Sequence, residues 1–215
     1  MTKPEIIGST RSSYTRAVCM VCEEKGIDYT LTEVTLDAPE LRAIHPFARM
    51  PVMKHGNLEL FESAAIATYL DRSFDGPQLF PSDPRRAALT EQWISFVNTV
   101  VDRTMVRTYL YAYIATADGK PDSAAIERVM PDVHAQMAVL DKALAKTGHL
   151  VDDIFTFADI NLLPILDRLR LPPEGAAALA GSPNVAAYYA LHAARPSFLR
   201  TVPPPGPPRR WKVGT

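Results

Sequence analysis

Two adjacent segments of the chain contain residue types that could together bind a small anionic ligand. Gly56-Asn57 lies between two runs of alternating polarity, residues 52–55 and 58–61, and this pattern predicts a tight β-hairpin. Pro51 begins the first of these strands, where its missing N–H is tolerated. Ser63 follows the hairpin as the predicted N-cap of a helix. The free N–H groups and the positive dipole end at that position predict a small anion site.

The elements that must position these residues mix strands and helices in the first third of the chain. Apolar spacing, turn residues and the helix-ending Gly26 predict strand 5–8, helix 14–25, strand 29–35, helix 39–44, strands 52–55 and 58–61, and helix 63–73. The order β-α-β-α-β-β-α, with a proline at the start of the third strand, is that of a thioredoxin-like α/β domain.

The remainder of the chain is helical in pattern, which predicts a second, all-α domain. Thr156 to Asp159 has the form of a capping box, with Asp159 in place of the usual Glu or Gln. The predicted helices are 85–117, 123–146, 156–171 and 184–194. The predicted organisation is therefore domain 1–75, linker 76–84, helical domain 85–200 and a Pro-rich tail 201–215, which we expect to be extended.

Composition excludes several classes of function. The chain has 215 residues, of which 47% are hydrophobic, so it can bury a substantial core. With 23 Lys and Arg against 24 Asp and Glu, the net charge is -1, and no broad basic field favours nucleic acid or an anionic membrane. No apolar run approaches the ~18 residues of a membrane span and no secretory signal is visible. We expect a soluble, cytoplasmic protein.

The cysteines and histidines do not predict a metal or redox centre. Cys19 and Cys22 lie inside the first predicted helix, past the turn where the dipole activates a thiolate, and we expect them to pack in the core. The five histidines show no H-x-x-x-H or H-x-H spacing. We therefore expect no metal site.

Hydroxyl groups occupy the start of the first helix. In thioredoxin-like redox proteins a C-x-x-C stands at this position. Here the residues are Ser12-Ser13-Tyr14-Thr15. The replacement of both thiols disfavours disulfide exchange by the protein itself and retains hydrogen bonding to the sulfur of a bound ligand.

With these residues in view, the chain resembles the cytosolic glutathione S-transferase superfamily, of the serine type, over roughly residues 4–200. The resemblance is closest to the phi-type pattern, with theta-type and zeta-type enzymes as neighbours. It rests on three ordered segments and on the capping box: Ser12-Ser13-Tyr14-Thr15 with Glu24-Lys25-Gly26, the stretch His45 to Val52, and Leu60-Phe61-Glu62-Ser63 with Tyr69-Leu70. Each segment alone is a weak motif, and their order and spacing together are specific.

The resemblance implies that Ser12 hydrogen-bonds the glutathione sulfur. A free thiol has a pKa of about 8.5, and lowering it by ~2 units needs about 2.7 kcal/mol of preferential thiolate stabilisation. One charge-assisted hydrogen bond of ~1.5–3 kcal/mol, with a helix N-terminus beside it, can supply that energy. Ser9, Ser13 and Thr15 compete for the same role, and Ser12 also fits a plain helix cap. We expect Tyr14 to serve packing more than catalysis.

The resemblance also implies how glutathione is held. The Met50-Pro51 peptide is expected to be cis and to let the main chain of Met50 pair with the cysteinyl part. Ser63 and Glu62 would bind the carboxylate and the ammonium of the γ-glutamyl end. Arg49 stands where the phi pattern has glutamine, and either clamps a glutathione carboxylate or is a solvated surface residue. For the glycyl carboxylate only Arg42 and His45 remain nearby, so that subsite stays open.

The electrophile pocket implied by the family would be formed by the first loop and the long helix, with Arg11, Arg103, Arg107, Tyr109 and Tyr113 as candidates. The implied function is conjugation of glutathione to a small apolar electrophile, with glutathione as co-substrate and no metal or prosthetic group. A homodimer is implied, although Trp93, Phe96 and Val97 fit internal packing equally well. Two alternatives remain, a zeta-like glutathione-dependent isomerase suggested by Arg11-Ser12-Ser13 and a non-catalytic interaction scaffold.

Overall fold

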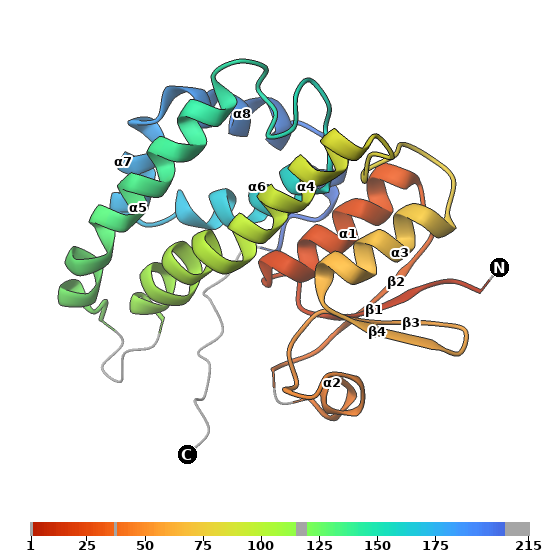
Figure 1. The fold of residues 1–215 in the computed structure, drawn as a ribbon. Helices are drawn as coiled ribbons and strands as arrows, with labels where there is room; N and C mark the ends of the chain where they lie inside the picture. Colours follow the sequence, from red (N-terminus) through yellow and green to blue (C-terminus); the bar gives the residue numbers. More distant parts are fainter. Residues whose placement is uncertain (1, 37, 115–119, 205–215) are drawn as a thin grey trace.

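A four-stranded sheet and a set of long helices form the two halves of the computed structural model, which describes residues 2–36, 38–114 and 120–204 (Figure 1). The elements in chain order are β1 (Glu5–Gly8), α1 (Ser13–Lys25), β2 (Thr30–Glu33), α2 (Pro39–Ile44), β3 (Val52–His55), β4 (Leu58–Phe61), α3 (Ser63–Ser73), α4 (Pro84–Phe96), η1 (Val97–Leu110), α5 (Ser123–Leu144), α6 (Phe157–Leu169), α7 (Pro173–Ala180), α8 (Pro183–Ala193) and α9 (Pro196–Arg200).

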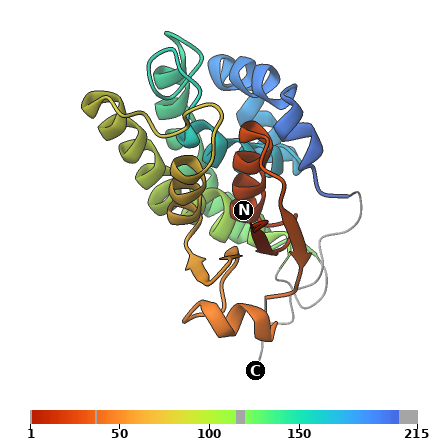
Figure 2. The ribbon, with the colours of Figure 1, turned by 90° about the vertical axis from the view of Figure 1, so that its right-hand side faces the viewer.

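The sheet has the strand order β2-β1-β3-β4, with β2 parallel and β3 antiparallel to β1. Helices α1 and α3 cover one face and α2 covers the other, as both views show (Figures 1 and 2). Because side chains alternate along a strand, Ile6 belongs to the main core with α1 and α3, while Ile7 packs with Leu41 under α2. The hairpin closes at Gly56-Asn57. The predicted thioredoxin-like βαβαββα domain is confirmed.

The long helix after the linker is less regular than expected. The sequence predicts one helix over 85–117, whereas α4 continues into η1, a π-helix. Buried residues on η1 recur in pairs at 101–102, 105–106 and 109–110, a wider repeat than the 3.6 residues of an α-helix. Val97, one of three residues weighed for a dimer interface, is fully buried in the core.

The capping box at the start of α6 is confirmed. The Thr156 hydroxyl accepts a hydrogen bond from the Ala158 N–H, and the Asp159 carboxylate accepts one from the Thr156 N–H at 2.9 Å. Asp159 also accepts the Leu150 N–H at 3.0 Å, so this buried carboxylate ties the preceding loop to the helix. Burial raises the pKa of Asp159.

A buried ion pair joins the two halves. Arg16 on α1 donates through Nη1 to the carboxylate of Asp167 on α6, and both residues are buried. The same guanidinium donates through Nη2 to the Phe198 carbonyl at 3.3 Å and lies 4.1 Å from the centre of the Phe198 ring. Hydrogen bonds from Tyr189 and Arg16 outweigh the opposing effect of burial and lower the pKa of Asp167.

Some predictions concern parts that the structure does not test. The connection between α3 and α4 runs over residues 74–83, and the proposed boundaries 1–75, 76–84 and 85–200 stay a prediction. Of the predicted extended tail 201–215, residues 205–215 lie outside the described residues. Along the ranges that are described, no helix is both long enough and apolar enough to cross a membrane.

Removing the buried cation should weaken the junction of the two domains. We expect Arg16→Met to lower the free energy of unfolding by about 3 kcal/mol or more, because Asp167 then remains buried with less compensation. Arg200→Met is a matched control, since Arg200 pairs with Glu23 of the same α1 but is exposed, and should cost less than about 1 kcal/mol. Urea unfolding measures both. Equal costs would show that the Arg16 pair is no more important than a surface contact.

His192 predicts an acid-side loss of stability. Burial lowers its pKa from 6.5 to about 4, and its Nδ1 has no hydrogen-bond partner among the described residues. As the pH falls from about 6.5 towards 4, His192 is therefore protonated in the unfolded chain before it is protonated in the folded protein. The free energy of unfolding falls by up to about 3 kcal/mol over that window. Above pH 6.5 this loss of stability does not occur.

We expect His192→Phe to flatten this part of the curve of unfolding free energy against pH, because an aromatic ring without a titrating nitrogen fits beside Tyr188 and Phe155. The exposed His134, changed to Asn, is the control and should leave the slope unchanged. An unaltered slope in His192→Phe would assign the pH dependence to other groups.

Candidate active site

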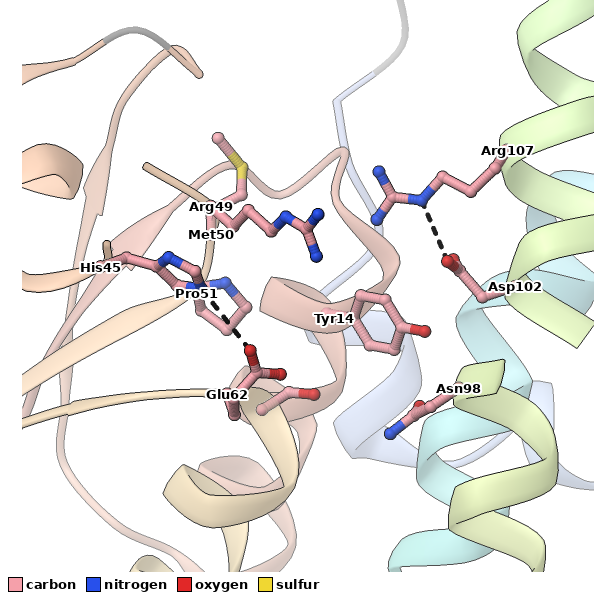
Figure 3. A pocket seen from close by; sticks show the side chains of 10 residues that line it. Tyr14, His45, Arg49, Met50, Pro51, Glu62, Asn98, Asp102 and Arg107 are labelled. Carbon is pink, nitrogen blue, oxygen red and sulfur yellow. Dashed lines mark hydrogen bonds and ion pairs between the residues drawn. The ribbon is translucent and has the colours of Figure 1, made fainter. Parts of the chain in front are cut away.

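A cavity of about 150 Å³ lies where the two halves meet (Figure 3). Ten residues line it: Tyr14, His45, Arg49, Met50, Pro51, Glu62 and Ser63 from the thioredoxin-like half, and Asn98, Asp102 and Arg107 from η1. All five residues predicted to bind glutathione, Arg49, Met50, Pro51, Glu62 and Ser63, are thus brought together. The cavity has one wall from each domain.

The turn into β3 is formed as expected. The Met50-Pro51 peptide bond is cis, which confirms that prediction, and Pro51 directly precedes β3. Because Met50 and Pro51 both line the cavity, the main chain of this turn is placed where a peptide-like ligand can pair with it.

The start of α3 differs by one residue from the prediction. Ser63 was expected to be the N-cap, but it is the first helical residue, and Glu62 is the N-cap, with no side-chain cap hydrogen bond. The physical reason is the backbone of Glu62, whose φ of 69° lies in the left-handed region and turns the chain sharply from β4 into the helix. The Ser63 N–H belongs to the first turn, where N–H groups have no partner within the helix. The anion site therefore persists at this helix start.

His45 lies beside the carboxylate of Glu62. The ring is buried, and its Nδ1 accepts a hydrogen bond from the Phe47 N–H at 3.0 Å. The neutral imidazole then carries its proton on Nε2, which lies 3.6 Å from Glu62 Oε1. The sequence placed His45 near the site but gave it no role toward Glu62.

The wall formed by η1 carries an ion pair. Arg107 Nε donates to Asp102 Oδ2 at 3.0 Å. These residues are five apart, a spacing that meets on a π-helix, and Thr108 Oγ1 likewise donates to the Arg103 carbonyl five residues before it. Burial alone would lower the pKa of Arg107, but the negative charge of Asp102 and its hydrogen bond have the larger effect, so the pKa is raised.

Tyr14 points into the cavity toward this pair (Figure 3). Burial, followed by the nearby Asp102 carboxylate, raises the pKa of Tyr14, so its hydroxyl stays protonated at neutral pH. The expectation that Tyr14 mainly packs overlooked this placement. Asn98 and Asp102 were missed entirely, because an α-helical reading of residues 85–117 gives no reason to group them with Arg107.

The hydroxyls at the start of α1 are not equally available. Ser12 is the N-cap, as the alternative reading allowed: its Oγ accepts the Thr15 N–H at 3.3 Å, and it does not line the cavity. The hydroxyl oxygens of Ser13 and Thr15 are buried and have no hydrogen-bond partner in the described part of the chain. Thr15 packs against Gly8, where a Cβ would lie 2.5 Å from Thr15 Oγ1. Ser9 and Ser12 remain partly accessible.

Of the five residues proposed for the electrophile pocket, Arg107 alone lines the cavity. Arg103 is exposed on η1. Tyr109 is buried and accepts the Gly175 N–H at 2.8 Å, and both Tyr109 and Tyr113 donate to Glu174 on α7. Arg11 donates to the Pro204 carbonyl at 3.0 Å. The tyrosines therefore hold helices together, since their hydroxyls are used by α7.

Across the described ranges no group of three His, Cys, Asp or Glu side chains could hold a metal ion. Cys19 and Cys22 are free and buried, and burial raises the pKa of both thiols.

The fold and this cavity define a two-domain protein that binds a small ligand between a thioredoxin-like domain and a helical domain. Residues 6–78 match the family model "Glutathione S-transferase, N-terminal domain", and residues 123–191 match "Glutathione S-transferase, C-terminal domain". The chain belongs to the glutathione S-transferase family.

Similar proteins agree with this assignment. Glutathione S-transferase 3 of Zea mays is 32% identical over 228 residues, covering 97% of this chain and 98% of that protein. The structure of glutathione S-transferase III in apo form has a TM-score of 0.81 at 29% identity, covering 96% of this chain and 100% of that one. The theta class glutathione S-transferase of Xanthomonas axonopodis pv. citri, with glutathione bound, has a TM-score of 0.81 at 29% identity and covers 94% and 98% of the two chains.

Proposed function

We propose that this protein is a glutathione transferase that joins the sulfur of glutathione to an electrophilic carbon of a small molecule. The observation that carries the proposal is a cavity in which the Met50-Pro51 turn and the helix start at Glu62 and Ser63 face a wall of the second domain. These groups match a tripeptide with a main chain, a terminal carboxylate and an ammonium.

Each charged end of glutathione has a complementary group. The Ser63 N–H and hydroxyl would bind the γ-glutamyl carboxylate, and Glu62, which lies beside His45, would bind the ammonium. Arg49 is exposed, stacks 5.9 Å from the Phe47 ring centre and makes no ion pair with a described residue, so it is the cation available for the glycyl carboxylate. His45 Nε2 instead faces Glu62, at 3.6 Å from Oε1.

The residues at the start of α1 would stabilise the glutathione thiolate. A hydroxyl can accept one hydrogen bond and donate another, so Ser12 can accept from the Thr15 N–H and still donate to sulfur. The thiol would release its proton to solvent, the sulfur would form a bond to carbon, and the leaving group would depart with its electron pair. The product is a thioether.

We further propose that the protein acts in detoxification in the cytoplasm, as a homodimer. Supporting a dimer, Phe47 is 77% exposed in the loop before the Met50-Pro51 turn, where a second copy would cover an apolar ring. Sedimentation velocity distinguishes the dimer from a monomer.

Glutathione binding tests the proposed function directly. We expect Glu62→Gln to raise the Kd for glutathione about tenfold, because a charge-assisted hydrogen bond to the ammonium is lost. Glu59→Gln is the control, since Glu59 pairs with Lys54 on the hairpin and does not line the cavity. Isothermal titration calorimetry measures both. If the wild type does not bind glutathione, the proposed function is wrong. If the two variants bind glutathione with equal affinity, Glu62 does not bind the ammonium.

The group that lowers the thiol pKa can be identified by titrating bound glutathione through its thiolate absorbance. We expect Ser12→Ala to raise the thiol pKa by about 1–2 units relative to wild type, since the donated hydrogen bond is lost. Tyr14→Phe removes the hydroxyl that lines the cavity two residues after Ser12. A shift in Tyr14→Phe without one in Ser12→Ala would transfer the role to Tyr14.

A further inference from the structure

The cavity wall that faces the glutathione residues is polar. It presents Asn98, Asp102 and Arg107 of η1, with Tyr14 beside them, where an apolar electrophile pocket was expected. We propose that this wall recognises electrophiles that carry a carboxylate, and that Arg107 is the residue that determines this specificity. The inference rests on the proposed transferase function and names the class of its second substrate.

The guanidinium of Arg107 is fixed in a suitable direction. Its Nε donates to Asp102, which holds the group at one edge, and its terminal nitrogens point into the cavity toward the guanidinium of Arg49 (Figure 3). The one further hydrogen bond of this guanidinium to a described residue is a long one, from Nη1 to the Tyr111 hydroxyl at 3.4 Å. Arg107 is 48% exposed and can therefore reach a ligand. A planar fork of N–H donors suits a carboxylate.

Asp102 does not cancel this preference for an anion. Its carboxylate is already engaged by Arg107 Nε and faces the Tyr14 hydroxyl, so it has little capacity left for a ligand. Arg168 on α6 donates to the Arg11 carbonyl and makes no ion pair with a described residue. The nearest acid in sequence, Asp167, is held by Arg16 and Arg170.

The two cavity arginines come from different domains and have different ligands available. Arg49 lines the cavity on the glutathione side, where it is our proposed cation for the glycyl carboxylate. Arg107 belongs to η1 and is left for the second substrate. A carboxylate on the electrophile would then lie against η1 while its reacting carbon faces the start of α1.

The test compares 4-chloro-3,5-dinitrobenzoate with the neutral 4-chloro-3,5-dinitrobenzamide, which has nearly the same shape. With either compound the glutathione sulfur forms a bond to the ring carbon, chloride leaves with the electron pair of the broken bond, and the thiol proton goes to solvent. Each kcat/KM is divided by the uncatalysed rate with glutathione, which removes the difference in intrinsic reactivity. The quantity compared is the ratio of benzoate to benzamide.

We expect Arg107→Gln to lower this ratio about tenfold or more relative to wild type. Arg103→Gln is the matched control, because Arg103 lies on the same helix, is exposed and does not line the cavity, and its ratio should equal that of the wild type. An unchanged ratio in Arg107→Gln, or an equal fall in Arg103→Gln, would overturn the inference. If the wild type conjugates neither compound to glutathione, the result contradicts the proposed transferase function itself, and not only the role of Arg107.

A second measurement needs no variant and covers the case in which Arg107→Gln does not fold. In the wild type, raising the salt concentration from about 0.02 M to about 0.5 M should lower the benzoate to benzamide ratio several-fold, because salt screens a half-exposed ion pair. A ratio independent of salt would contradict recognition of the charge.

Discussion

The buried ion pair between Arg16 and Asp167 is the contact on which the shape of the cavity depends. Arg16 and Tyr14 are two residues apart on α1, so their side chains leave the helix about 200° apart. Arg16 reaches α6 and the Phe198 carbonyl, while Tyr14 faces the cavity. Fixing one side of α1 therefore fixes the other. Since a buried charge without a partner is costly, the two domains are held in the register that brings η1 opposite the Met50-Pro51 turn.

The helix η1 gives the second wall its chemistry. On an α-helix, Asp102 and Arg107 would lie about 140° apart and would not meet. The wider winding brings them to 3.0 Å and leaves the terminal nitrogens of Arg107 at the cavity. One wall thus offers mainly main-chain groups and a helix start, and the other offers a fixed guanidinium. This asymmetry fits the proposed division of the site into a part for the peptide and a part for the second substrate.

The sequence predicted most of the sheet domain because its signals are local. Alternating polarity around Gly56-Asn57 defined the hairpin, and a proline defined the start of α2 at residue 39. The errors at the site have physical causes that no local pattern carries. Ser63 was predicted as the N-cap because serine is a preferred N-cap residue, and no local pattern shows that Glu62 adopts a left-handed backbone. Tyr109 was placed in the pocket because its partner on α7, Glu174, is 65 residues away in sequence.

The hydroxyls around the start of α1 show how tertiary packing narrows what sequence leaves open. Ser9, Ser12, Ser13 and Thr15 are equivalent in chemistry. Thr15 is used to pack α1 against β1, and only a glycine at position 8 leaves room for it. Ser13 is covered as well. The donors that can still reach a ligand are therefore those of Ser9, of the helix cap Ser12 and, two residues further, of Tyr14. Of these, Tyr14 alone lines the cavity, which it shares with Asp102. A sulfur bound beside Ser12 would meet a neutral donor, which favours a thiolate, whereas the Tyr14 hydroxyl can donate its one proton either to that sulfur or to the Asp102 carboxylate, but not to both.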